Sequence, residues 1–103
     1  MKKEWKKFEQ DTFLCVETAW QKRILEYSEG KGIYAEIYYW DYPDNSIKYP
    51  YELHLQIPEE ISITGTTIDV NCFLNFEKCK IDFSDCDKKA NLIINKLICF
   101  QKI

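Results

Sequence analysis

Alternation of side chains between residues 33 and 57 constrains the fold of this chain more than any other feature. Residues 33–42 are dominated by aromatic and β-branched side chains, which predicts a strand of about ten residues. Residues 51–57 alternate between an apolar and a polar face, as expected of a half-buried second strand. The two strands are expected to form an antiparallel hairpin, joined by a long loop at 43–50 that contains Pro43 and Pro50.

A helical period of three and four residues lies on both sides of this hairpin. On the N-terminal side, apolar residues follow this spacing from residue 5 to residue 27 and predict a long helix that ends at Gly30. An N-cap at residues 11–12 would divide it into two helices. On the C-terminal side, Ser84 or Asp85 is expected to cap a helix whose apolar stripe continues nearly to residue 103.

The segments between the hairpin and the last helix complete the predicted sheet. Residues 61–63 and 67–76 have strand character, Gly65 marks a bulge or turn between them, and 80–83 is expected to add a short strand. Residues 1–103 are therefore expected to form a single α+β domain with two layers. In it, a three- to five-stranded antiparallel sheet carries an N-terminal and a C-terminal helix on one face.

Length and composition agree with a small globular domain. At 103 residues, with 46% apolar and 30% charged residues, the chain can bury one core but not two. No apolar run approaches the roughly 20 residues that span a bilayer, and acidic residues interrupt any signal-like core near the N-terminus. The five cysteines, an odd number, suit a reducing compartment, so a cytoplasmic location is expected.

No cofactor or metal site is predicted. Cys72, Cys79 and Cys86 recur every seven residues, whereas zinc ligands are typically paired two to four residues apart. The only histidine, His54, is isolated in the sequence. Burial as small hydrophobic side chains is the commoner role of free cysteines.

The polar and aromatic face of the hairpin is the strongest candidate for function. Aromatic residues reach 16% of the chain, more than a core of this size needs, so some are expected at the surface. If the alternate residues of the first strand point into the core, the residues between them share the opposite face. The predicted partner-binding residues are Tyr34, Glu36, Tyr38, Trp40, Tyr42, Asp44, Glu52, His54 and Asp69.

Two structural alternatives compete with this interpretation. Tyr and Trp rings among carboxylates are typical of interface hot spots, but cross-strand aromatic pairs also stabilise a sheet that has no partner. Exchanging the inward and outward faces of the first strand, or a first helix that covers part of both faces, would bury the same rings.

The charge distribution supplies a second, independent indication. Residues 29–87 hold twelve acidic against four basic side chains, whereas residues 88–103 hold four basic and no acidic ones. An acidic sheet region repels nucleic acid, whose binding needs basic grooves, and attracts a cationic protein. A cationic protein partner is therefore expected, with neither nucleic acid nor membrane as a ligand; solubility alone is the other explanation of these charges.

Catalytic motifs give little support to an enzyme. His54 has Glu52 two residues away on the same strand face, but no local signature joins it to a nucleophile. Small size, acidity and exposed rings are the features of a stoichiometric inhibitor. In general character the chain resembles the immunity proteins that neutralise bacterial toxins, especially basic nucleases. The alternatives are a homo-oligomer or homodimer that buries the aromatic face, a phage-type inhibitor of a host nuclease, and a small enzyme that uses His54.

Overall fold

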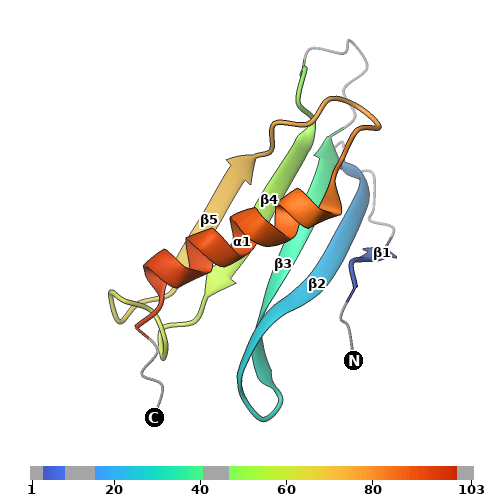
Figure 1. Cartoon of the computed structure of the whole chain (residues 1–103). Coiled ribbons are helices and arrows are strands. Elements are labelled where there is room, and N and C mark those ends of the chain that lie inside the picture. The colour runs from blue at the N-terminus through green and yellow to red at the C-terminus, as the bar shows by residue number, and fades with distance from the viewer. Residues whose placement is uncertain (1–3, 9–15, 41–46, 100–103) are drawn as a thin grey trace.

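The structure, a computed structural model, describes residues 4–8, 16–40 and 47–99 and shows one antiparallel sheet with one helix (Figure 1). The five strands are paired in the order in which they follow one another along the chain. In that order the elements are β1 (Lys6–Phe8), β2 (Val16–Ser28), β3 (Lys31–Trp40), β4 (Tyr51–Ile57), β5 (Ile68–Phe73) and α1 (Phe83–Leu97).

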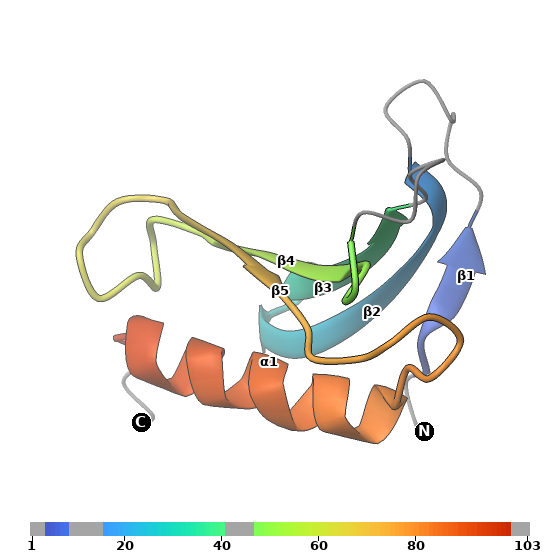
Figure 2. The ribbon, with the colours of Figure 1, turned by 90° about the horizontal axis from the view of Figure 1, so that it is seen from above.

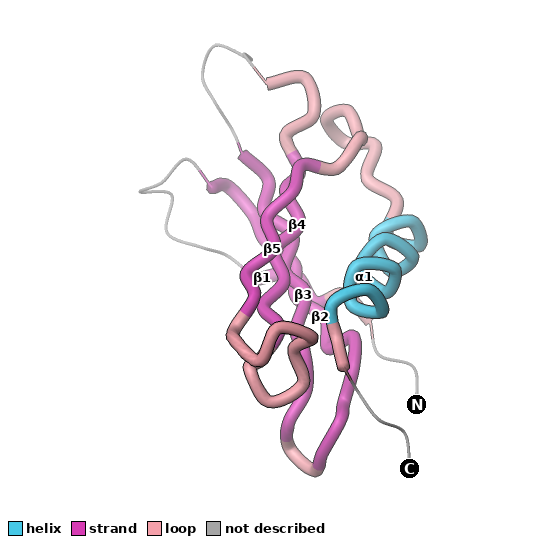
Figure 3. The backbone as a smooth tube through the Cα atoms, turned by 90° about the vertical axis from the view of Figure 1, so that its left-hand side faces the viewer, coloured by secondary structure: helices cyan, strands magenta, loops and turns pink. Residues whose placement is uncertain are grey.

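The molecule has two layers, with α1 along one face of the curved sheet and no other described element on the opposite face (Figures 2 and 3). Alternate residues of β3 and β4 fill the space under the helix, because successive side chains of a strand point to opposite faces. From the helix side, α1 contributes three fully buried residues, Cys86, Ala90 and Ile94, which are spaced one turn apart. The core consists mainly of Ile33, Ala35, Ile37, Tyr39, Tyr51, Leu53, Leu55, Ile57 and these helical residues.

The predicted N-terminal helix is wrong, because the chain forms β1 and β2 there. Trp20 and Lys22 face the helix layer, opposite Ile37 and Ala35 of β3. A register shift between Arg23 and Leu25 then inserts one extra residue, so that neighbouring residues both pack against the core. Because a lysine takes a core-facing position and bulges shift the register, the apolar residues of β2 recur every three or four residues instead of every two.

The predicted hairpin is confirmed by the β3–β4 pair, in which Ile37 lies opposite Leu53 and Tyr38 opposite Glu52. The described part of the connecting loop is limited to residues 47–50, where the carbonyl of Pro50 accepts a bond from the Trp40 amide at 2.9 Å. The strand expected at 67–76 is present in shorter form as β5. Its alternate residues Ile68, Val70 and Cys72 pack against the core.

Two shorter predicted strands are wrong. Residues 61–63 form a turn that is joined to the end of α1 by an isolated bridge between Ser62 and Ile98. Residues 80–82 are irregular and lead directly into the helix. The helix cap is Asp82 instead of the expected Ser84 or Asp85, since its carboxylate accepts the Ser84 amide at 2.9 Å. The helix ends at Leu97, and residues 100–103 lie outside the described part of the chain.

Candidate functional site

The face of the sheet that points away from α1 is formed by alternate residues of the four longer strands, and we call it the open face. The registers place Arg23 opposite Tyr34, Gln21 opposite Glu36, and His54 opposite both Glu36 and Asn71. The open face comprises Gln21, Arg23, Tyr34, Glu36, Tyr38, Trp40, Glu52, His54, Gln56, Asp69, Asn71 and Phe73.

The structure brings together every predicted partner-binding residue that it describes. These residues are Tyr34, Glu36, Tyr38, Trp40, Glu52, His54 and Asp69. The other two, Tyr42 and Asp44, lie outside the described residues. The inward orientation assumed for β3 is also observed, since its alternate residues, including Ile33, Ala35 and Ile37, are buried.

Glu52 is the centre of a hydrogen-bond network on this face. Its Oε1 accepts the indole N–H of Trp40 at 2.9 Å and lies 2.9 Å from Nε2 of His54. The His54 ring also packs on Tyr38, with 4.4 Å between the ring centroids. One carboxylate and one imidazole therefore hold two aromatic rings in fixed positions across β3 and β4.

A second carboxylate, that of Glu36, is held in the same way. Its Oε1 accepts the hydroxyl of Tyr38 at 3.1 Å, and its Oε2 accepts the amide of Gln21 at 3.4 Å. Further along the face, Oδ1 of Asp69 accepts the amide of Gln56 at 3.0 Å. Neutral donors thus orient these carboxylates and leave their negative charge uncompensated.

Three other described carboxylates do lie next to cations: Asp87 is 2.8 Å from Lys22, Glu26 is 2.7 Å from Arg23, and Glu60 is 3.5 Å from Lys31. Among the described residues, no Lys or Arg forms an ion pair with Glu36, Glu52 or Asp69, and the one ionic contact of Glu52 is His54. An excess of negative charge therefore faces solvent on β3, β4 and β5.

The sequence prediction missed the residues that β2 contributes to the open face, because β2 was assigned to a helix. The guanidinium of Arg23 donates to the Tyr34 hydroxyl at 2.6 and 3.1 Å and lies over the Tyr34 ring at 5.0 Å. Gln21 reaches Glu36 from the same strand. The polar residues at 21 and 23 could have indicated an outward face only if residues 16–28 had been recognised as a strand.

The open face is hollowed next to His54. A cavity of about 540 Å³ is open to solvent, and its lining includes Tyr34, Glu36, His54, Gln56, Asp69 and Asn71. The hollow is large enough for a side chain or a short peptide segment, and its walls are mostly carboxylate, amide and phenol groups. Two rings at its margins are well exposed, Tyr34 at 43% and Phe73 at 51%.

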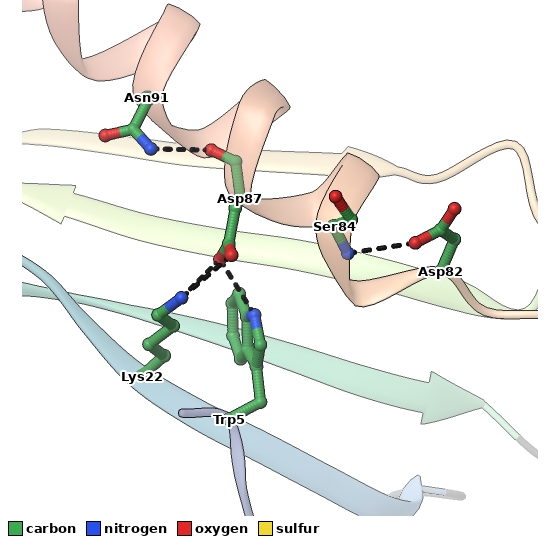
Figure 4. A network of polar contacts seen from close by, with 6 residues as sticks. All are labelled: Trp5, Lys22, Asp82, Ser84, Asp87 and Asn91. Carbon is green, nitrogen blue, oxygen red and sulfur yellow. Dashed lines mark hydrogen bonds and ion pairs between the residues drawn. The ribbon is translucent and has the colours of Figure 1, made fainter. Parts of the chain in front are cut away.

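A second polar cluster lies on the other face, where α1 begins (Figure 4). Asp87 accepts the indole N–H of Trp5 at 2.9 Å and binds the Lys22 ammonium through both carboxylate oxygens at 2.8 Å. The rings of Trp5 and Trp20 both pack on Phe83. A cavity of about 510 Å³ lies here, lined by Glu4 and Asp87 among others. The charge of Asp87 is already paired with Lys22, so these contacts connect β1 and β2 to the helix.

The four cysteines that the structure describes are free thiols. Cys79 and Cys99 are exposed, Cys72 is half-buried in β5, and Cys86 is buried under the helix. Burial raises the pKa of the Cys86 thiol to about 12 and also raises the pKa of Cys72. Among the described residues, no three His, Cys, Asp or Glu side chains are grouped as a metal site would need.

Comparisons with protein-family models, with curated proteins and with solved structures found no match. In the part of the chain that the structure describes, no helix is long and apolar enough to cross a membrane. The function must therefore be inferred from the geometry and charge of the chain itself.

Proposed function

We propose that this chain is a non-catalytic binding protein whose open face covers a basic surface of another protein. The observation that carries the proposal is the charge imbalance of this face. Glu36, Glu52 and Asp69 lie close together and are oriented by neutral donors or by His54, and no Lys or Arg of the described chain forms an ion pair with them. Electrostatic complementarity of this kind steers association and excludes partners of the wrong charge.

The rings of the open face supply the second part of the argument. Trp40 and Tyr38 are already fixed by Glu52, Glu36 and His54, so little side-chain entropy is lost when a partner packs on them. Trp and Tyr in such surroundings are the residues that most often dominate binding energy. The polar hollow next to them offers space for a partner's side chain.

The biological role that fits these features is that of an inhibitor, and an immunity protein for a basic toxin such as a nuclease is the specific form. Active clefts that attract phosphate groups are basic, and a surface rich in carboxylates can occupy them in place of the substrate. A phage-type inhibitor of a host nuclease would use the same chemistry. Both roles require a one-to-one complex and no catalytic group in this chain.

A growth experiment tests this role directly. The gene next to the one for this chain is expressed alone and together with this chain, and cell growth is followed. We expect growth to stop with the neighbouring product alone and to recover with the chain, and Trp40→Ala to lose about 2 kcal/mol of binding energy and much of the protection. A neighbouring product that is not toxic, or toxicity that the chain does not relieve, would contradict the role.

One observation favours a second candidate, a small enzyme. His54 lies 2.9 Å from Glu52 and lines the open hollow, and a carboxylate next to an imidazole can orient it as a general base. The described side chains around the hollow include no serine, threonine, cysteine or lysine as a nucleophile. In the growth experiment, a His54→Ala variant that loses all protection while it still binds the partner would favour the enzyme.

A further inference from the structure

We propose that the outer edge of β5 binds an extended basic segment of the partner, which joins the sheet as an added strand. The inference rests on the proposed function and goes beyond it, because it states how the partner is held and what its sequence must look like. The observation behind it is the direction of the backbone N–H and C=O groups of β5, which is independent of the charge of the open face.

The hydrogen-bond pattern shows which backbone groups of β5 point outward. The Leu74 amide donates to the Tyr51 carbonyl at 2.7 Å, so Leu74 and Tyr51 form a hydrogen-bonded pair. Because hydrogen-bonded and non-hydrogen-bonded pairs alternate along an antiparallel ladder, the next pair, Phe73 and Glu52, has no direct backbone hydrogen bonds. The register is continuous to the start of the strand, so the same holds for Asp69 and Asn71. The N–H and C=O groups of Asp69, Asn71 and Phe73 therefore point away from β4.

These groups lie at the end of the sheet, and nothing in the described part of the chain is paired with them (Figure 1). Proteins usually protect such an edge with lysine, proline, a bulge or a very short strand. The opposite edge, β1, has three residues and carries Lys6 and Lys7. The six residues of β5 contain no lysine or proline, and the β4–β5 pair has no register shift. Of the two edges, only β5 is a regular template.

The side chains of β5 specify the chemistry of the added strand. On the open face, Asp69 is uncompensated and Phe73 is 51% exposed. On the helix side, Ile68, Val70 and Cys72 are half-buried and would gain burial from a neighbour. A strand that alternates basic and apolar residues satisfies both faces, with its cations next to Asp69 and the other carboxylates of the open face.

A second copy of this chain fits the edge less well. In an antiparallel pair of two β5 strands centred on Val70, the two Asp69 carboxylates would be diagonal neighbours on the open face. That arrangement opposes like charges, whereas a basic segment from another protein opposes none on the open face.

The test uses the full chain and a synthetic peptide, acetyl-Lys-Val-Arg-Val-Lys-Val-amide, followed by NMR of backbone amides. We expect the largest shifts, and slower hydrogen exchange, at the amides of Asp69, Asn71 and Phe73. A control peptide with the same charges is N-methylated at the amides that would face β5, and we expect it to bind at least about tenfold more weakly. Asn71→Pro should weaken binding similarly and clearly more than Asn71→Ala, since both variants remove the Asn71 side chain but only the proline removes an outward N–H.

Three results would overturn the inference. Equal binding of the two peptides, with shifts around Glu36 and His54, would mean that charge alone holds the ligand; the proposed function would then survive without the added strand. Absence of shifts in β5 at any peptide concentration would reject the edge as a site. A dimer in sedimentation that Asn71→Pro converts to a monomer would assign the edge to a second copy. If Asn71→Pro does not fold, the comparison of the two peptides on the unmodified chain decides.

Discussion

At the scale of single residues, Lys22 shows how a charged side chain is kept on the core side of a strand. Its ammonium is bound by both oxygens of Asp87, and its side chain lies under α1 with Trp20 as the next core-facing neighbour. The apolar part of a lysine can cover hydrophobic surface while the charge stays paired. Together with the bulges of β2, this residue removes the alternation that would have identified the strand in the sequence.

Cys86 gives a prediction at the same scale. Burial raises the pKa of its thiol to about 12, whereas the thiol of the unfolded chain ionises near the ordinary value of 9.0. Because the folded state keeps the proton longer, the contribution of Cys86 to stability is complete below about pH 9 and is lost as the pH rises toward 12.

Urea unfolding at pH 8 and pH 10 measures this effect. The free energy of unfolding should fall by about 1 kcal/mol more in the unmodified chain than in Cys86→Ala over this interval. Tyr51 and Cys72, whose pKa values are also raised by burial, contribute equally to both proteins. The same decrease in both proteins would mean that the Cys86 thiol is accessible to base in the folded state.

At the scale of elements, β2 determines the shape of the sheet and both polar clusters. Its alternation directs Lys22 to Asp87 on one side and Arg23 to Tyr34 on the other, and bulges that shift the register follow these two residues. Gly32 of β3 permits the close approach at one of these bulges, because a Cβ there would lie 2.5 Å from the carbonyl oxygen of Leu25. Glycine at this position is therefore required by the packing of β2 on β3.

The contact between Asp87 and the two N-terminal strands gives a prediction for this element. Asp87→Asn removes the charge that holds Lys22 and weakens the bond to Trp5, so the free energy of unfolding should fall by about 1 kcal/mol, since the pair is partly exposed. Amide exchange in β1 should become faster. The control is Asp85→Asn in the first turn of α1, for which the structure shows no partner among the described side chains and we expect a smaller loss. Equal losses would assign the effect to the helix dipole.

The elements that could be predicted from the sequence are those in which local pattern and tertiary environment agree. In β3 and β4, core-facing and outward-facing residues alternate without a break from residue 33 to 40 and from 51 to 57, and the inward and outward faces of both strands were predicted correctly. In β2, good helix formers such as Leu25 and Glu26 occupy a strand whose bulges depend on contacts with β3. Residues 80–83 also have strand character, but Asp82 caps a helix there. The open-face residues of β3, β4 and β5 were therefore predictable, whereas Gln21 and Arg23 were not.

At the scale of the whole molecule, one face of the sheet makes the structural contacts with the helix and the other carries the proposed function. One face of the sheet is occupied by α1 and carries the paired charges of Lys22 and Asp87. The other face carries carboxylates that form no ion pair with a Lys or Arg of the described chain, oriented rings and an open hollow, and it ends at the regular edge of β5. These features together describe a surface suited to a basic protein, and the central claim is that binding depends on the carboxylates of this face.

Calorimetric titration of the chain with the partner identified in the growth experiment tests this claim most directly. Glu36→Gln with Asp69→Asn removes two charges from the open face, and Glu29→Gln with Glu77→Gln removes two exposed charges elsewhere. We predict that the open-face pair weakens binding about 100-fold at low salt and less at high salt, while the control pair changes it by no more than about threefold. Equal affinity losses in the two double variants, or none in the open-face pair, would contradict the account.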